Sequence, residues 1–240
     1  WWCMQLMSRA GFHLSAKNNG GVVTAEFVGC GMPKKNQRKS TTDWSNATTA
    51  NGLQDIEDTV VAASAEGVTI RYVVMHVADF SLLKKQKSTF DTLKAWVNSS
   101  SKILVTKNLI NEYLAEQEIP VKIITVNPAV RIEDSAHRRK TINPWERKRV
   151  CFLEDLKVGD IQHGPIAAES SATLQKIALM VKQDWILVTK WSELEPFKEW
   201  TKAEANAIPV VNDPDAMFIM KVDGKDWNAS EDTEGTDDIP

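Results

Sequence analysis

Two pairs of adjacent carboxylates, Glu133-Asp134 and Glu154-Asp155, are the residues best suited to acid–base or metal chemistry. Such a pair can bind a hard cation or divide the roles of general acid and general base. Each pair, however, lies beside a predicted strand end or turn, where acidic residues are common because they keep the surface soluble. Neither spacing supplies a third ligand. The sequence therefore favours a protein that is not an enzyme.

No catalytic or nucleotide-binding motif accompanies these carboxylates. The chain has no G-x-x-x-x-G-K-[ST] loop, no G-x-G-x-x-G, no G-x-S-x-G and no H-E-x-x-H. The four histidines stand singly, and His76, at the end of an apolar run, is predicted to be a hydrogen-bonded core residue. Cys3, Cys30 and Cys151 lack metal-binding spacing and are predicted to be small buried side chains. We therefore expect neither a cofactor nor a metal ion.

Two basic clusters point to binding rather than to catalysis. The first cluster is Lys34, Lys35, Arg38 and Lys39, and the second is His137, Arg138, Arg139 and Lys140. Aromatic residues are not interleaved with either cluster, so a solvated loop or a surface for a protein partner is favoured. Contact with nucleic-acid phosphates remains an open alternative for both.

Length and composition describe a chain that can build a substantial core. It has 240 residues, of which 42% are hydrophobic and 25% charged. No apolar run approaches the roughly 18 residues of a membrane helix, so no membrane partner is expected. The net charge of -3 is uneven, because residues 223–240 hold seven acidic residues against one lysine and the rest of the chain is net positive. The chain begins with Trp rather than Met, so we expect it either to be processed or, as the favoured interpretation, to be part of a longer protein.

Hydrophobic periodicity predicts an alternation of strands and helices. A helix is expected at 53–66, with Asn51 and Gln54 forming a capping box and Gly67 ending it. One further helix is expected from Asp79 to Val97, another from Thr106, a buried helix within 1–14 and a helix-like turn at 199–207. The predicted strands are 22–28, 68–77, 121–126, 150–153, 185–188, 208–211 and 216–222. This order favours an α/β or α+β layer.

The stretch 143–169 has the most specific pattern in the chain. It opens on a Pro144-Trp145 corner, continues into a strand, and turns at Gly159 and again at Gly164. Trp145 and the other tryptophans are predicted to be core or interface anchors rather than platforms for nucleobases.

A succession of short motifs in this stretch and around it resembles the major capsid proteins of tailed bacteriophages (Caudovirales type), and most closely their lambda-like branch. The motifs are, in order, Asn18-Asn19-Gly20-Gly21, Asp43-Trp44-Ser45, Ile119-Pro120-Val121-Lys122-Ile123, Asn127-Pro128, Arg131-Ile132-Glu133, Ile142-Asn143-Pro144-Trp145, Phe152-Leu153, Leu156-Lys157-Val158-Gly159, Gly164-Pro165, Ala168-Glu169, Trp200-Thr201 and Ile208-Pro209-Val210. The resemblance spans residues 1 to 222 and depends on the order of the motifs.

The resemblance implies an α+β fold of the Hong Kong 97 capsid type. Such a fold has a peripheral domain, with a spine helix and long strands, and an axial domain, with a mixed sheet flanked by helices. We expect the peripheral part at 1–67 with the spine helix at 53–66, and the axial domain at 68–204. A return strand is expected at 205–222 and an acidic mobile tail at 223–240.

The resemblance also implies a structural virion protein that self-assembles into hexamers and pentamers of an icosahedral shell around phage DNA. Its partners would be copies of itself, scaffold, portal and decoration proteins, and packaged double-stranded DNA bound without sequence specificity. It would be made in the host cytoplasm. The candidate subunit-interface residues are Lys34, Lys35, Arg38, Lys39, Arg138, Arg139, Trp145, Gly159 and Gly164. The alternative is an intracellular α/β nucleic-acid-binding protein that uses the basic loops 34–39 and 137–149.

Overall fold

The computed structural model describes residues 2–13, 27–98, 103–119, 121–133, 138–166, 179–183, 185–194 and 197–227. The chain divides into two compact units, which are described separately. Unit 1 comprises residues 1–158 and 213–240, and unit 2 comprises residues 159–212. Unit 1 therefore includes residues on both sides of the predicted boundary at 67/68, and the division into peripheral and axial domains stays a prediction.

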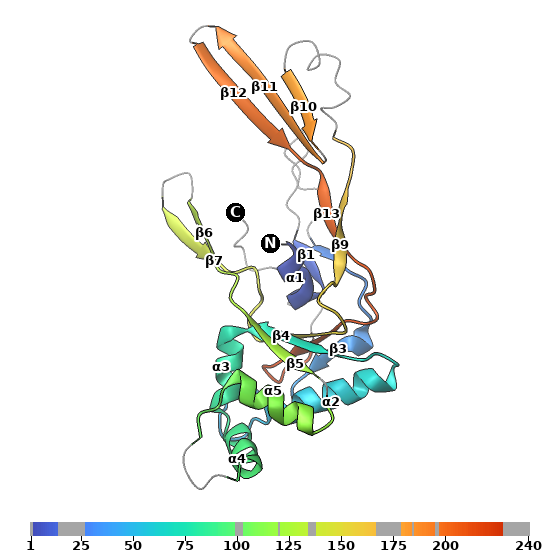
Figure 1. The fold of residues 1–240 in the computed structure, drawn as a ribbon, viewed down its shortest axis with the longest axis vertical. Coiled ribbons are helices and arrows are strands. Elements are labelled where there is room, and N and C mark those ends of the chain that lie inside the picture. Colours follow the sequence, from blue (N-terminus) through green and yellow to red (C-terminus); the bar gives the residue numbers. More distant parts are fainter. Residues whose placement is uncertain are drawn as a thin grey trace. The chain divides into compact units, whose positions relative to one another are not determined.

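Unit 1 contains all the described helices and most of the strands (Figure 1). Its helices are α1 Trp2–Arg9, η1 Lys34–Asn36, α2 Gly52–Ala65, α3 Val77–Lys85, α4 Lys87–Trp96 and α5 Lys107–Glu116. Its strands are β1 Gly11–His13, β2 Phe27–Gly29, β3 Gln37–Lys39, β4 Tyr72–His76, β5 Lys122–Val126, β6 Val130–Glu133, β7 Arg139–Ile142, β8 Arg149–Leu153 and β14 Phe218–Lys221.

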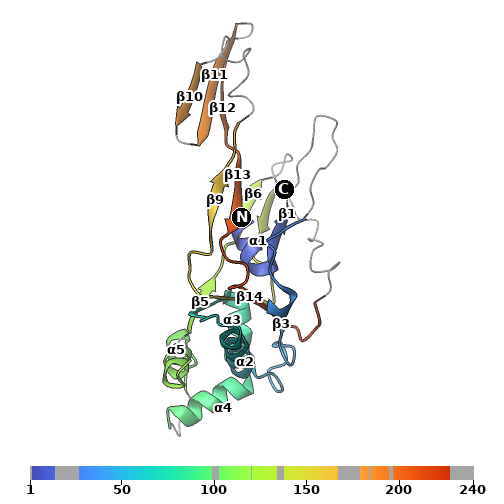
Figure 2. The same cartoon turned by 90° about the vertical axis from the view of Figure 1, so that its right-hand side faces the viewer.

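A five-stranded mixed sheet in the order β3-β14-β8-β4-β5 forms the centre of unit 1. The two outer pairs, β3 with β14 and β4 with β5, are parallel, whereas β8 is antiparallel to both β14 and β4. Helices α2 to α5 lie on one face of this sheet and α1 lies on the other (Figures 1 and 2). The mixed α+β architecture agrees with the predicted fold class.

Successive residues of the central strands enter two separate cores, because side chains alternate between the faces of a sheet. Val73 and Met75 of β4 pack against the helical face, while Val74 between them packs against the side of α1. In β8, Phe152 belongs to the first core and Cys151 to the second. Strands buried on both faces read as continuous apolar runs, which is why these strands were evident from the sequence.

Helix α2 confirms the predicted helix but not its predicted cap. Asn51 makes no side-chain capping hydrogen bond. The amide of Gly52 instead donates to Oε1 of Gln86, at 2.7 Å, from a residue 34 positions later in the chain. Gly67 follows the helix with φ of +81°, a left-handed conformation that favours glycine, as predicted.

The single helix predicted from Asp79 to Val97 is wrong, because the chain forms two helices that meet at Gln86. Gln86 has φ of -67° and ψ of 134°, an extended conformation that interrupts the helical backbone. The break lets its side chain reach Gly52, so the α2 cap and the α3–α4 boundary are one feature. The predicted start of α5 at Thr106 is confirmed, since Thr106 Oγ1 accepts from the Leu109 amide at 3.2 Å.

Unit 2 consists of a two-stranded ladder and a three-stranded antiparallel sheet. The ladder pairs β9 Gly159–His163 with β13 Ala207–Val211, and the sheet is β10 Leu179–Gln183, β11 Ile186–Leu194 and β12 Phe197–Glu204, in that order. The helix-like turn predicted at 199–207 is wrong, because residues 199–204 continue the β11–β12 pairing and Ala207 begins β13. Trp191 and Trp200 are direct cross-strand partners with ring centroids 6.3 Å apart, a contact that favours the strand.

Other predicted elements are shorter than expected or lie partly outside the described residues. The buried N-terminal helix ends at Arg9 and is followed by β1. Of the strand predicted at 22–28, the structure describes only Phe27 and Val28, in β2. Among the described residues, no helix has the length and apolar character that crossing a membrane requires.

Candidate subunit-interface surface

The first basic cluster lies on η1 and β3, at one edge of the five-stranded sheet. Asn36 fixes this segment. Its side chain is fully buried, and its Nδ2 donates to the carbonyl oxygens of Asp215 and Met217 at 2.7 and 3.0 Å. Because Asn36 points inward between the lysines, the basic side chains on either side of it are displayed on the surface.

Two of the four bases already have acidic partners within unit 1. Lys35 Nζ lies 2.5 Å from Glu66, just past the end of α2, and Lys39 pairs with Asp226. Within the part of the chain that the structure describes, neither Lys34 nor Arg38 forms an ion pair. The predicted cluster therefore contains two lysines with acidic partners in the same chain and two bases, Lys34 and Arg38, whose charges are available to another molecule.

The start of the acidic segment 223–240 lies against β3. Trp227 donates its indole N–H to the carbonyl oxygen of Arg38 at 2.6 Å, and the guanidinium carbon of Arg149 lies 4.7 Å from the centre of its ring. Lys221 Nζ donates to the Asp226 carbonyl at 3.2 Å. Since exposed ion pairs contribute little, the tryptophan contacts are the main anchor. The part of the predicted mobile tail beyond residue 227 lies outside the described residues.

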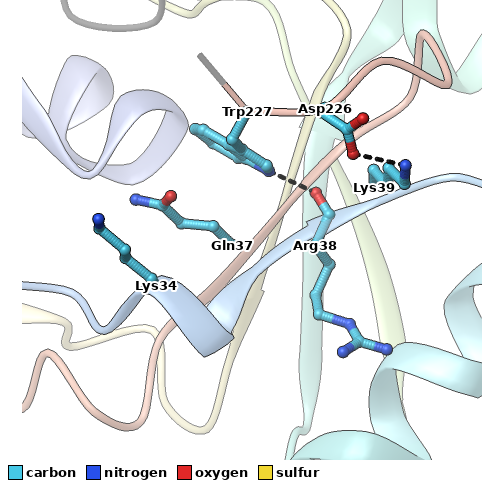
Figure 3. A pocket seen from close by; sticks show the side chains of 6 residues that line it. All are labelled: Lys34, Gln37, Arg38, Lys39, Asp226 and Trp227. Carbon is cyan, nitrogen blue, oxygen red and sulfur yellow. Dashed lines mark hydrogen bonds and ion pairs between the residues drawn. The ribbon is translucent and has the colours of Figure 1, made fainter. Parts of the chain in front are cut away.

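Together these residues enclose a groove of about 560 Å³ beside β3. It is lined by Lys34, Gln37, Arg38, Lys39, Asp226 and Trp227. Figure 3 shows Trp227 above the strand with its ring nitrogen directed at the Arg38 carbonyl, while the Arg38 guanidinium extends away from the ring. The lining combines cations with one aromatic face, so it suits an anionic segment of protein better than a neutral small molecule.

The second basic cluster does not join the first. Arg138 and Arg139 belong to the β6–β7 hairpin or its edge, and Arg139 Nε lies 4.0 Å from Glu133 across it. His137 lies outside the described residues. Arg138, Arg139 and Lys140 are all exposed. This hairpin is thus a separate basic surface.

The last three cations of the loop 137–149 make contacts within the subunit. Arg147 Nη2 lies 3.2 Å from the fully buried Asp79 carboxylate, and Lys148 Nζ lies 3.1 Å from Asp43. Arg149 is buried beneath Trp227. Because these three cations make contacts within the subunit, they are not free to bind nucleic-acid phosphates. This observation disfavours the alternative of a nucleic-acid-binding loop at 137–149.

Trp145 is buried within the subunit, which corrects its selection as an exposed interface candidate, whereas Gly159 is half-buried and Gly164 is exposed, so both stay predictions. Trp145 is 1% exposed, packs in the core on the α1 side of the sheet, and donates from Nε1 to the Arg149 carbonyl at 3.3 Å. Gly159 and Gly164 flank the β9–β13 ladder. A Cβ at Gly159 would lie 2.0 Å from the Val210 carbonyl oxygen, so this glycine permits a close approach of the two backbones.

The acidic pairs show no sign of a reactive site. Among the described residues, no group of three His, Cys, Asp or Glu side chains could hold a metal ion. Glu154 and Asp155 are exposed, and Asp155 accepts from the adjacent Leu156 amide at 2.6 Å. Asp134 lies outside the described residues.

His76 is a core residue, as predicted. It is buried, and its Nδ1 accepts from the Ala78 amide at 3.1 Å, which caps the start of α3. Burial, with the nearby positive charge of Arg147, lowers the pKa of His76 below its ordinary value, against the opposing effect of Asp79. Cys151 is buried as expected, whereas Cys30 is half-buried and Cys3 is exposed.

The geometry so far describes a subunit with charged surfaces and two clusters of buried apolar side chains, one on each face of its central sheet. A sequence model for one protein family, described as Phage major capsid protein E, matches residues 1–222. The chain belongs to this family of phage major capsid proteins. The prediction of the phage capsid protein family is therefore confirmed.

One solved structure shares the fold of this chain. A protein from Escherichia coli CFT073, described as a prophage capsid protein, superposes with a TM-score of 0.59 at 14% identity, over 92% of this chain. This chain spans 61% of the length of that protein. A phage-related protein from Bordetella bronchiseptica RB50 matches with a TM-score of 0.46 at 12% identity, over 82% of this chain and 59% of its own. No curated protein sequence matches the chain.

Sequence reasoning missed the residues that hold the start of the acidic segment, Trp227 and Arg149. One signal was present, because Trp227 is the one aromatic residue within 223–240. A large aromatic side chain in an otherwise polar segment is an anchor more often than a solvated residue. Its partner could not be named from the sequence, since Arg149 is 78 positions away.

Proposed function

We propose that this chain is the shell-building part of a major capsid subunit, which self-assembles into hexamers and pentamers of an icosahedral shell around phage DNA. The match of the capsid family to residues 1–222 carries the proposal. The likeness of the fold to the prophage capsid protein supports it. The arrangement would be of the Hong Kong 97 type, with a peripheral and an axial domain, and the protein would reside in the virion after synthesis in the host cytoplasm.

The work of such a subunit is association, and it needs no catalytic residues. Identical subunits make the same contacts repeatedly, and the symmetry of those contacts closes the shell. Scaffold, portal and decoration proteins would act as partners during assembly, and packaged double-stranded DNA would contact the inner surface without sequence specificity. An absence of enzymatic activity belongs to this proposal.

The ion pairs of the first basic cluster indicate which of its charges would make contacts between subunits. Lys35 and Lys39 have partners in their own chain, whereas Lys34 and Arg38 have none among the described residues. We expect Lys34 and Arg38 to meet acidic side chains of a neighbouring subunit. The variant Lys34→Gln/Arg38→Gln should reduce particle yield and salt resistance while leaving subunit stability unchanged.

The matched control is Lys35→Gln/Lys39→Gln, which removes the same charge from the same segment. It should affect particle formation less, because those charges are satisfied within the subunit. Equal particle yields for both variants and the parent would show that this surface takes no part in assembly.

Negative-stain microscopy of the purified protein tests the proposal itself. Shells, tubes or capsomers are the expected result. A protein that stays monomeric and binds DNA tightly, with an affinity that falls steeply with salt, would overturn the proposal and favour the nucleic-acid-binding alternative.

A further inference from the structure

Strand β12 leaves one long edge of the unit 2 sheet without a described partner. It is the last strand in the order β10-β11-β12, and every residue from Phe197 to Ala203 is exposed. Figure 1 shows β12 at the outer side of this sheet. An exposed edge of this length offers a row of backbone N–H and C=O groups to another strand, and natural proteins usually shorten, bend or cover such edges.

Two exposed aromatic side chains on β12 favour binding of another protein at this edge. Phe197 is 68% exposed and Trp200 is 45% exposed. Trp200 stacks on Trp191 of β11 on one side, and its other side faces the open edge. Aromatic side chains that are only partly covered within a subunit are enriched where another protein binds.

The charges along β12 are complementary to the same strand running in the opposite direction, although Lys202 and Glu204 also form an ion pair with each other within the strand. When two copies of β12 pair antiparallel about Thr201, Lys198 of each copy lies opposite Glu204 of the other. Trp200 then lies opposite Lys202, which permits a cation–π contact. A two-fold axis repeats both contacts, so the pairing gains four favourable cross-strand contacts.

The neighbouring registers are less favourable. Centring the pair on Ala203 also opposes Lys202 and Glu204, but it pairs only residues 202–204 of β12, whereas centring it on Thr201 pairs residues 198–204. Centring the pair on Trp200 places Lys198 opposite Lys202. Centring it on Glu199 or on Lys202 places that residue opposite its own copy. Like charges directly opposite one another destabilise a sheet. Among the registers centred on residues 199 to 202, only the one centred on Thr201 joins opposite charges and opposes no like charges.

We propose that β12 is a homotypic contact, which joins two copies of this chain edge to edge through an antiparallel pair centred on Thr201. The result is a continuous six-stranded sheet across a two-fold axis, an isologous interface built by strand addition. In this six-stranded sheet, charges of opposite sign alternate across neighbouring strands. Glu193 of β11 lies opposite Lys198 of β12 in the same chain, and Lys198 lies opposite Glu204 of the other copy. The inference goes beyond the proposed function, because a shell could form without this contact.

Cysteine crosslinking tests the register directly. In a Cys3→Ser background, which removes the exposed native thiol, Thr201→Cys places a cysteine opposite itself. Cα atoms of directly opposed residues are about 4.5–5.5 Å apart, within disulfide range. We expect rapid formation of a covalent dimer under mild oxidation.

The matched control is Glu199→Cys, in the same background and on the same exposed strand. In the proposed register the two copies of residue 199 are displaced by four residues, about 14 Å along the strand. They should crosslink only slowly. Crosslinking at 199 as fast as at 201, or at neither position, would overturn the proposal.

Charge reversal provides an independent test in solution. Lys198→Glu and Glu204→Lys each create two like-charge oppositions in a homotypic pair and should weaken self-association about tenfold. A mixture of the two variants restores every opposite-charge pair, so it should associate as the parent does. Lys190→Glu on β11 is the control, since it makes an equal charge change away from the edge. The association constants are measured by sedimentation equilibrium.

The outcomes separate this inference from the proposed function. If the mixture fails to recover while both variants keep the parent circular dichroism spectrum, the β12 contact is wrong. If shells form in the microscope although Thr201→Cys does not crosslink, the capsid proposal stands and the β12 contact is refuted.

Discussion

Trp227 lies on the buried guanidinium of Arg149, with the guanidinium carbon 4.7 Å from the ring centre, and donates its indole N–H to Arg38 on the edge strand. Three segments far apart in the sequence thus meet at one side chain. The cation lies beneath the ring and the strand lies beside it, so the acidic segment begins from a fixed point on the subunit rather than from a free end.

The Trp227→Ala variant should release the start of this segment. Loss of the ring contact and of one hydrogen bond should lower the free energy of unfolding by about 1–2 kcal/mol. The clearest readout is trypsin cleavage after the exposed Lys225, which should become several-fold faster. Trp185→Ala removes an exposed tryptophan in unit 2 and should leave that cleavage unchanged. Equal cleavage rates in the parent and in Trp227→Ala would show that the ring is not the anchor.

A second prediction concerns the N-terminal cap of α2. The sequence predicts Asn51 as the capping residue, whereas the structure shows Gln86 in that role. Gln86 Oε1 accepts from the buried Gly52 amide, whereas Asn51 is exposed and makes no capping bond. Gln86→Met keeps the side-chain length but leaves a buried N–H without an acceptor, which should cost about 1–3 kcal/mol. Asn51→Ala should change stability by less than about 0.5 kcal/mol. Urea denaturation measures both variants, and the opposite ranking would restore the sequence-predicted cap.

The same example shows what the sequence could and could not predict. Val73 to Met75 and Val150 to Leu153 are apolar without interruption, a pattern typical of a strand covered on both faces. The protein family could also be predicted from the sequence, because the resemblance depends on the order of local motifs. Gln86, however, acts on a residue 34 positions away, and no local pattern marks a glutamine as the cap of a distant helix.

The candidate surface was predictable only in part, for a related reason. The sequence identifies Lys34, Lys35, Arg38 and Lys39 as a cluster, but their partners come from the end of α2 and from residue 226. Whether a charge is free or satisfied depends on tertiary contacts. Trp145 was misplaced for the same reason, since a tryptophan at a turn can equally be a surface anchor or, as here, a core residue.

Gly159 should tolerate no side chain, whereas Gly164 at the other end of β9 should. A Cβ at Gly159 would be 2.0 Å from the backbone oxygen of Val210, and backbone cannot move aside without breaking the ladder. We expect Gly159→Ala to cost at least about 2 kcal/mol and to remove hydrogen-exchange protection from β9 and β13. The nearest atom at Gly164 belongs to the flexible Asn206 side chain, 3.0 Å away, so Gly164→Ala should retain the protection. Similar protection in both variants would contradict this account of the close approach.

His76 should make the stability of unit 1 depend on pH in the mildly acidic range. Its Nδ1 can accept from the Ala78 amide only while the ring is unprotonated, and burial together with Arg147 holds its pKa below the unfolded value. Because the unfolded chain binds the proton more readily, the stabilisation is complete above about pH 6.5 and is lost as the pH falls toward the folded pKa. His76→Asn keeps a side chain that can cap α3 but cannot titrate. Urea denaturation between pH 5 and pH 8 should therefore show a decline at low pH for the parent that is reduced in His76→Asn, and parallel curves for the two proteins would assign the pH dependence to other groups.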